Sequence, residues 1–314
     1  MSVSVLTVQN LTKKFRSGWW PFTNPYEYVA VNDISFSVNE KEILGFLGPN
    51  GAGKTTTIQM LLGTLTPTSG SIHYFGQDFA TNRYEILKKA RYASGYDSLP
   101  PQLTILENLD IIGRIYGLSK TKRAEQIEQL LKLFDMWNMR NKETGTLSAG
   151  QATRVMLVKA FLGDPQLVLL DEPTASLDPD IAQEVRQFIL EQNKTSGMSI
   201  LVTSHNMDEV TEMCDRVLVL KKGRIIASDT PENLAASIAQ ARINLIITQE
   251  YDALVHYLEN KGLSYIKHEH SVEVLLDEHA IAHFLSDIAK HHIIYSHISI
   301  DKPTLEDYFL SVAK

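Results

Sequence analysis

The chain of 314 residues contains a single cysteine, Cys214, so it cannot form an intrachain disulfide, and we expect a reducing, cytosolic environment. It lacks any apolar run of the roughly 18 residues that a membrane-spanning helix needs. It also lacks a basic surplus, because the formal net charge is −7, which argues against a nucleic-acid partner. Its first residues have neither the basic nor the apolar region of a signal peptide. These absences favour a globular, non-secreted protein that does not itself cross a membrane.

The segment GPNGAGKTT fits the phosphate-loop pattern GxxxxGK[ST]. An apolar strand is predicted before it at 42–47, and a helix after it at 55–62. Glycines let consecutive backbone N–H groups surround a phosphate at a helix N-terminus, which attracts anions. Lys54 adds positive charge for the β- and γ-phosphates, and the Thr55 hydroxyl can reach Mg²⁺. The other residues predicted to bind the nucleotide here are Gly48, Pro49, Asn50, Gly51, Ala52, Gly53 and Thr56.

Two later apolar strands are predicted to end in polar side chains. The strand at 166–171 ends in Asp171, which is placed to hold Mg²⁺, and Glu172 follows where a base could polarise an attacking water. The strand at 199–204 is followed by His205, which could donate a hydrogen bond to a γ-phosphate. Ligands bind at the carboxyl ends of parallel strands, so the sequence predicts one site that contains Lys54, Glu172 and His205 as catalytic residues.

The motif LSAGQ lies between the phosphate loop and Asp171, and ASLD follows Glu172. In this order the motifs resemble those of the ATP-binding cassette (ABC) family, over about residues 3–228. The resemblance identifies GPNGAGKTT as a Walker A motif, LVLLDE as a Walker B motif, LSAGQ as the signature, ASLD as the D-loop and His205 as the switch histidine. It implies ATP and Mg²⁺ as ligands, and it adds to the nucleotide-binding residues Ser148, Ala149, Gly150, Gln151 and Asp178.

The resemblance also implies an α/β fold and a domain organisation. The cassette would span residues 1–228, with a RecA-like P-loop NTPase core formed by 1–95 and 165–228 and a helical subdomain at 96–160. One Walker A motif and one signature make half of each composite site, so two cassettes would enclose two ATP molecules. The second cassette would be another copy of this chain or a similar subunit. The pore would be a separate integral-membrane permease, with this chain bound peripherally at the cytoplasmic face of the membrane.

Two departures from the family pattern motivate an alternative. Ala149 replaces the first of two adjacent glycines in the signature, which costs about 1 kcal/mol or more if that position needs a positive φ, and little otherwise. Gly95 stands where the family has the glutamine that touches Mg²⁺ and the attacking water, and Gln102 is seven residues too late to replace it. The alternative is therefore a regulatory or weakly hydrolysing cassette that pairs with a more competent partner.

The helical subdomain is predicted from local signals. Thr104 and Glu107 form a capping-box pattern that opens a helix reaching about Tyr116, and a second helix is predicted at 122–134. The stretch 97–102 is predicted to be either one wall of the groove that receives the permease or an ordinary surface loop.

Aromatic residues gather between the first two predicted strands. The family places an aromatic ring against adenine in this region, and both Phe15 and Tyr28 fit that position. Trp19 and Trp20 could touch lipid headgroups or the membrane partner, or they could form a self-packed hairpin tip.

Residues 229–314 show only alternating strand and helix periodicity. Strands are predicted at 243–248, 265–268, 272–276 and 293–300, with helices starting near Tyr251 and Ile281. The order β-α-β-β-α-β indicates a small ferredoxin-like α+β accessory module. Eight of the ten histidines lie in 256–297, where a metal site, a pH-sensing surface and a plain solvated surface stay open. The tail at 303–310 resembles the ending of ATPase subunits of bacterial drug and polysaccharide exporters.

Overall fold

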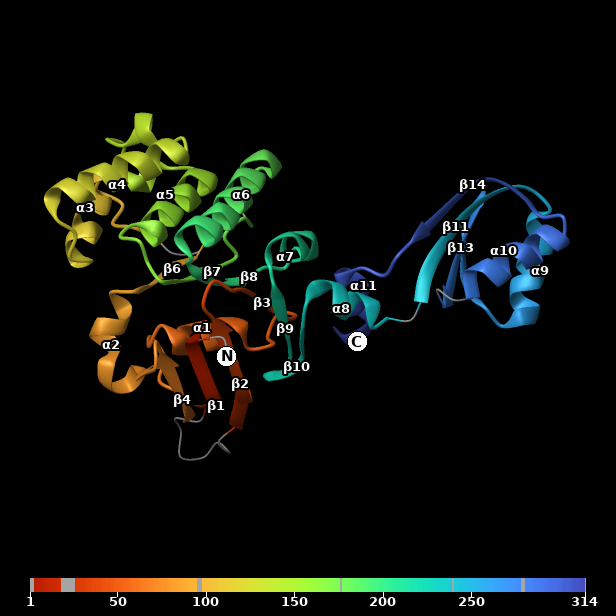
Figure 1. The fold of residues 1–314 in the computed structure, drawn as a ribbon, viewed down its shortest axis with the longest axis horizontal. Helices are drawn as coiled ribbons and strands as arrows, with labels where there is room; N and C mark the ends of the chain where they lie inside the picture. Colours follow the sequence, from red (N-terminus) through yellow and green to blue (C-terminus); the bar gives the residue numbers. More distant parts are fainter. Residues whose placement is uncertain are drawn as a thin grey trace. The chain divides into compact units, whose positions relative to one another are not determined.

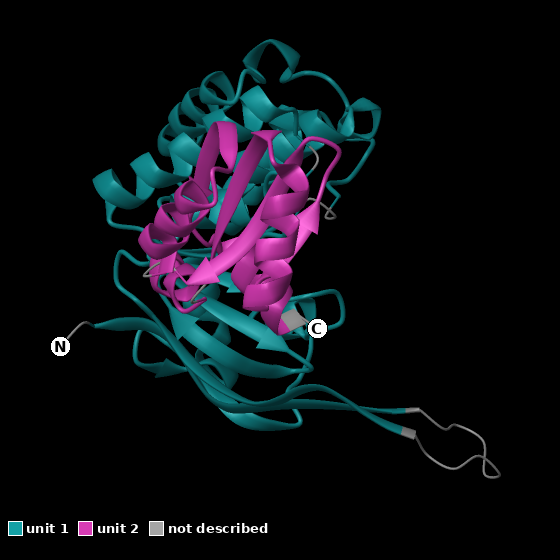
Figure 2. Cartoon of the chain, turned by 90° about the vertical axis from the view of Figure 1, so that its right-hand side faces the viewer, with its two compact units in different colours: residues 1–230 teal, residues 231–314 magenta. Residues whose placement is uncertain are grey.

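The computed structural model describes residues 3–17, 26–94, 98–175, 177–238, 240–277 and 280–313. The chain forms two compact units, residues 1–230 and 231–314 (Figure 2). The predictions for Trp19, Trp20 and Gly95 concern residues outside the described part, and so does His279, one of the eight histidines in 256–297. Within that part, no helix is both long enough and apolar enough to cross a membrane.

The first unit begins with an antiparallel sheet in the strand order β2-β1-β4-β5. Its first two strands pair with each other over most of their length, and they project as a long ribbon beyond the rest of the unit (Figure 2). Tyr74 is buried on this sheet, and its hydroxyl donates a 2.8 Å hydrogen bond to the carbonyl of Leu61. The strands are β1 (Ser4–Ser17), β2 (Tyr26–Asn39), β4 (Ser69–Tyr74) and β5 (Gln77–Asp78), followed by the helix α2 (Phe79–Leu87).

A second sheet has the strand order β10-β9-β3-β8-β7-β6. All its neighbours pair in parallel except β10 and β9. The strands β3, β7 and β8 are buried along their whole length, which explains their continuous apolar sequences. Because parallel strands end at one edge of a sheet, the loops after these three strands come together there. The strands are β3 (Ile43–Leu47), β6 (Ala90–Ser94), β7 (Leu167–Asp171), β8 (Ser199–Thr203), β9 (Arg216–Lys221) and β10 (Arg224–Asp229).

Helices complete the first unit. Three of them gather into a helical lobe (Figure 1): α3 (Ile105–Ile115), α4 (Lys120–Leu133) and α5 (Ala149–Phe161), with short 3₁₀ turns at Trp137–Met139 and Thr144–Thr146. Three more follow the parallel strands: α1 (Lys54–Leu61), α6 (Pro179–Ser196) and α7 (Met207–Met213). The capping box of Thr104 and Glu107 is confirmed. The second lobe helix begins two residues before its predicted start, because the Ser119 side chain caps it by accepting the N–H of Lys122.

The second unit contains all six elements predicted for it. They are β11 (Gln240–Gln249), α9 (Tyr251–Lys261), β12 (Ser264–Lys267), β13 (Ser271–Asp277), α10 (Ile281–Lys290) and β14 (Ile294–Asp301). The strands pair antiparallel in the order β12-β13-β11-β14, and an apolar cluster that includes Leu245, Leu258 and Phe284 joins the sheet to α9 and α10. The unit begins with α8 (Pro231–Ala236), against which the last helix, α11 (Leu305–Ala313), packs.

Candidate functional site: the phosphate loop and the strand ends beside it

The phosphate loop is held in a narrow space between β3 and α1. Gly53 has φ 105°, and a Cβ at this position would lie 2.6 Å from the carbonyl oxygen of Ala30 on β2. A Cβ at Gly48 would lie 2.7 Å from the carbonyl oxygen of Leu220. Both positions therefore require glycine. The first N–H groups of α1 have no hydrogen-bond partner within the helix. They are therefore available to a phosphate bound at this loop.

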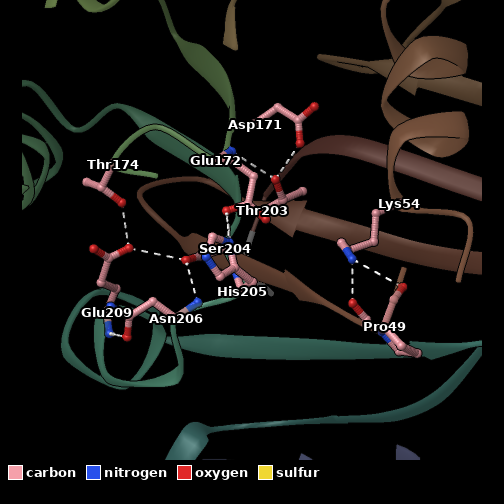
Figure 3. A network of polar contacts seen from close by, with 11 residues as sticks. Pro49, Lys54, Asp171, Glu172, Thr174, Thr203, Ser204, His205, Asn206 and Glu209 are labelled. Carbon is pink, nitrogen blue, oxygen red and sulfur yellow. Dashed lines mark hydrogen bonds and ion pairs between the residues drawn. The ribbon is translucent and has the colours of Figure 1, made fainter. Parts of the chain in front are cut away.

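Lys54 bends back over this loop. Its ammonium group donates hydrogen bonds to the carbonyl oxygens of Gly48 and Pro49, the second at 3.4 Å (Figure 3). Burial lowers the pKa of Lys54 below its ordinary value, and the carboxylates of Glu172 and Asp171 oppose that shift. The positive charge is thus held at the loop by short-range contacts and by the two acids across the site.

Asp171 ends β7 and is buried, with 7% of its surface exposed. Its Oδ1 accepts a 2.5 Å hydrogen bond from the hydroxyl of Thr203, the last residue of the neighbouring strand β8. The register of β7 on β8 places these two residues opposite each other. The strand pairing therefore fixes the direction of the Asp171 carboxylate.

Glu172 adopts a left-handed backbone conformation, with φ 53°, which is costly for a residue that is not glycine. Its N–H donates to both the carbonyl oxygen and the hydroxyl of Thr203, each at 3.1 Å, and these bonds stabilise the turn. The turn brings Glu172 Oε2 to 2.6 Å from Nδ1 of His205 (Figure 3). His205 is 73% exposed and Glu172 only 15%, so the carboxylate lies below the more exposed ring.

One cavity contains most of the predicted groups, whereas Gly48 and His205 are not among the described residues that line it. Its lining contains the loop from Pro49 to Thr56, Asp171 and Glu172, and also both candidate adenine-binding rings, Phe15 and Tyr28. These two residues are direct partners in the pairing of β1 with β2, so their rings lie on the same face of the ribbon. The sequence treated them as alternatives, whereas the structure places both at the cavity.

The signature segment lies elsewhere. Residues 147–151 and Asp178 are not among the described residues that line the cavity. Ser148 caps α5, where its hydroxyl accepts the N–H of Gln151 and the Gln151 side chain accepts the N–H of Ser148. Ala149 is the first residue of this helix and its φ is not positive, so its methyl group costs little. Asp178 is the N-cap residue of α6.

Sequence reasoning missed several polar residues behind the site. The Thr203 hydroxyl donates to the Asp171 carboxylate, and its hydroxyl and carbonyl oxygens accept the backbone N–H of Glu172. Thr174, Ser204 and Glu209 form a buried cluster beside it, in which Glu209 accepts hydrogen bonds from both hydroxyls. The hydroxyl residues at the end of the predicted strand 199–204 were a signal for Thr203 and Ser204. Glu209 had no distinguishing signal, because Asp208, Glu209 and Glu212 all look like surface acids in the sequence.

The cavity fits a nucleoside triphosphate with a divalent cation. Its glycines leave room for phosphate next to backbone N–H groups, and its paired rings offer apolar faces to a base. The Thr55 hydroxyl and the Asp171 carboxylate are hard oxygen ligands in the same cavity, as Mg²⁺ prefers.

Comparisons with known proteins agree with this geometry. The family model described as ABC transporter matches residues 31–175. The chain is 35% identical to the Nod factor export ATP-binding protein I of Burkholderia lata, over 76% of this chain and 74% of that protein. It is 32% identical to the uncharacterized ABC transporter ATP-binding protein YxlF of Bacillus subtilis, over 98% of this chain and 99% of that protein.

A solved structure shares the fold. It is a dimeric ATP-binding cassette in a post-hydrolysis state bound to ADP and Pi, and it matches 72% of this chain and 98% of its own with a TM-score of 0.64 and 22% identity. That likeness shows the fold, and the two relatives and the family model show the family. The chain belongs to the ATP-binding subunits of ABC transporters, a family of ATPases.

Proposed function

We propose that this chain is the motor subunit of an ABC exporter, which hydrolyses Mg²⁺-ATP as half of a cassette dimer and drives a separate membrane permease. The observation that carries the proposal is the placement of Glu172. Its carboxylate lies in the same cavity as the phosphate loop and is held 2.6 Å from His205. A carboxylate at the phosphate end of a nucleotide cavity is what a general base requires.

The phosphate loop would bind the phosphates of ATP. The N–H groups of residues 51–56 and the Lys54 ammonium would hold the β- and γ-phosphates, while Phe15 and Tyr28 would pack on the adenine. The Thr55 hydroxyl and Asp171 would hold Mg²⁺, which supplies positive charge that neutralises the phosphate oxygens. The 2.5 Å bond from Thr203 keeps the Asp171 carboxylate directed for that role.

Hydrolysis uses Glu172 and His205. Glu172 would accept a proton from a water whose oxygen bonds to the γ-phosphorus, while the bond from that phosphorus to the β–γ bridging oxygen breaks and ADP leaves. His205 would turn from Glu172 to donate a hydrogen bond to the γ-phosphate. Their present contact keeps the base and the sensing ring beside each other before the nucleotide arrives.

Dimerisation is supported by the position of the signature. Ser148 and the N-terminus of α5 offer an anion-binding helix end, yet they lie outside the cavity of their own chain. We infer that Ser148 to Gln151 complete the site of a second copy of this chain, with Asp178 near the same junction. The dimeric state of the structurally similar cassette supports this arrangement.

The transport role and the domain roles are extensions of the same proposal. The name of the Burkholderia relative, a Nod factor export protein, supports export, and an exporter subunit would bind peripherally at the cytoplasmic face of the membrane. We assign residues 1–95 and 165–228 to a RecA-like core and 96–160 to a helical subdomain. We assign 229–314 to a ferredoxin-like accessory module, and the sheet order β12-β13-β11-β14 supports that assignment.

The test is Mg²⁺-dependent ATP hydrolysis by the purified chain across a protein dilution series, with Glu172→Gln as the blank. We expect activity to rise faster than linearly with concentration, because two chains make each site. Tight ATP binding without turnover at any concentration would contradict an autonomous motor and support the regulatory alternative. Gly95→Gln would then be the next variant to assay.

A further inference from the structure

We propose that Glu209 is a positioning residue that holds the Glu172 turn and the His205 loop in their mutual arrangement. This inference rests on the hydrolytic function proposed above and deepens it. Glu209 lies in the first turn of α7, four residues after His205, and only 6% of its surface is exposed. A buried carboxylate is costly unless it is paired and hydrogen-bonded, so its contacts need an explanation.

Its carboxylate connects the loops that follow two neighbouring strands (Figure 3). Oε2 accepts a 2.6 Å hydrogen bond from the hydroxyl of Thr174, two residues after Glu172. The same oxygen accepts a 3.2 Å bond from the hydroxyl of Ser204, the residue before His205. One carboxylate oxygen therefore joins the segment that carries the proposed base to the segment that carries the proposed sensor.

The direction of these hydrogen bonds requires an acceptor at this position. Ser204 Oγ already accepts the N–H of Asn206 at 3.0 Å, so its own hydrogen is available to Glu209. Asn206 in turn caps α7 by accepting the N–H groups of Asp208 and Glu209. The loop after β8 and the start of α7 are thus one hydrogen-bonded unit. An amide group at position 209 could not accept from both hydroxyls and also receive the Arg186 contact on its other atom.

The second carboxylate oxygen reaches a third element. Oε1 of Glu209 accepts a 3.2 Å bond from Nη1 of Arg186 on α6, the helix whose N-cap residue is Asp178. Arg186 also pairs with Glu212 through Nε, at 2.7 Å. Glu212 lies on the same helix as Glu209, and it contacts Arg186 and Gln187, both on α6. Among the residues that the structure describes, Glu209 contacts both loops and Glu212 contacts neither.

That difference supplies a matched pair of variants. Glu209→Gln removes the charge and leaves one acceptor oxygen, so the amide cannot hold both hydroxyls and Arg186 at once, whereas Glu212→Gln removes only an ion-pair partner of Arg186. We expect Glu209→Gln to lower kcat for ATP hydrolysis roughly 10- to 100-fold, because small misplacements of catalytic groups have effects of this order. We expect KM for ATP to stay within about twofold, since the phosphate loop is untouched. Glu212→Gln should leave kcat within about twofold of the wild type.

A second pair of variants, at Thr174, distinguishes the loss of this contact from a folding defect. Thr174→Val removes the hydroxyl that binds Glu209 with little change of shape, and Thr174→Ser retains it. Thr174→Val should lower kcat in the same direction as Glu209→Gln, and Thr174→Ser should restore it. Equal losses in both Thr174 variants, or a kcat of Glu209→Gln equal to that of Glu212→Gln, would overturn the proposal while leaving the proposed ATPase function intact.

Hydrogen exchange in the nucleotide-free protein gives a readout that does not depend on activity. The N–H of Glu172 donates to the carbonyl of Thr203 at 3.1 Å, so it reports whether the turn is held. We expect this amide to exchange about tenfold faster in Glu209→Gln and at the wild-type rate in Glu212→Gln. If the wild type hydrolyses no ATP, the proposed function fails, and this comparison alone decides the role of Glu209. Equal rates in both variants would then overturn it.

Discussion

The cassette unit and the C-terminal unit differ in what they bury. Within the described residues, the first unit buries fourteen polar or charged side chains, among them Asp171, Thr203 and Glu209. The described residues of the second unit bury no such side chain, and its core consists of apolar residues such as Leu245 and Phe284. Buried polar groups are tolerated only when they are hydrogen-bonded, so they are kept where a geometry must be specified.

This difference predicts that substitutions of buried residues have different effects in the two units. In the cassette, the buried polar side chains behind the phosphate site orient a loop or a strand end, and their loss should change activity more than stability. In the C-terminal unit, the core serves to hold the sheet against α9 and α10, and its loss should change stability alone. Two substitutions test this contrast directly, and two further predictions sharpen it within the cassette unit.

Glu172→Gln is expected to have the largest effect. Removal of a general base should lower kcat about 10²- to 10⁴-fold, while ATP binding and the free energy of unfolding stay close to those of the wild type. Phosphate release and equilibrium ATP binding measure the two quantities. Glu191→Gln, an exposed acid on α6, is the control. A Glu172→Gln protein with more than a tenth of the wild-type kcat would contradict the assignment of the base.

Phe284→Ala should show the opposite behaviour. Phe284 is 3% exposed in the core of the C-terminal unit, and truncation of a buried phenylalanine costs about 3–5 kcal/mol. Calorimetry should show a lower melting temperature for that unit, with kcat and KM for ATP unchanged. Ser286→Ala, at an exposed position of the same helix, is the control. A large fall in kcat would contradict the prediction that the core of the C-terminal unit affects stability alone.

Asp110→Asn tests an ion pair in the helical lobe. A hydrogen bond from Arg123, and a second from Arg114, hold the pKa of Asp110 below its ordinary value. A depressed folded-state pKa means that the stabilisation is present above the unfolded-state value and is lost as pH falls through the folded-state value. The variant should be about 1–2 kcal/mol less stable at pH 7, a figure reduced because Asp110 is 35% exposed. The difference should vanish in acid.

Denaturant titrations at pH 7, 5 and 3 measure that difference. Arg114→Gln is the matched control, because Arg114 binds the same carboxylate but is 68% exposed. It should cost less than about 0.5 kcal/mol. A cost of Asp110→Asn that is the same at all three pH values would show that the charge of Asp110 contributes nothing.

Phe15→Ala and Tyr28→Ala should have the smallest effects. Loss of one aromatic contact is worth about 0.5–1.5 kcal/mol, so each variant should bind ATP roughly 2- to 10-fold more weakly. Binding of inorganic tripolyphosphate, which has no base, should not change and serves as the control. Because the two rings are cross-strand partners, the double variant should lose less than the sum. Equal weakening toward tripolyphosphate would show that the rings do not contact the base.

Several features were predictable because they depend only on neighbours along the chain. The phosphate loop needs glycines and a lysine at fixed spacing, and the capping box of Thr104 needs an acid three residues later. The elements of the C-terminal unit follow from the alternation of apolar residues. The strand ends at Asp171 and His205 could be predicted to meet, because buried parallel strands share an edge.

Other features could not be predicted because they depend on segments that are distant in the chain. Glu172 takes a left-handed conformation without the glycine or asparagine that signals one, since Thr203 supplies the bonds that hold it. Phe15 and Tyr28 both reach the cavity because β1 and β2 pair in that register.

The sequence by itself determined the family, the phosphate loop and the acids at the end of β7, because each is specified by residue types at short, fixed spacing. Only the tertiary structure decided that Glu209 is buried while Glu212 remains partly exposed, and that one carboxylate oxygen joins Thr174 to Ser204. The physical reason is that burial and hydrogen-bond partners arise when β7, β8 and α6 come together. Three acids within five residues of one helix look alike until that packing separates them.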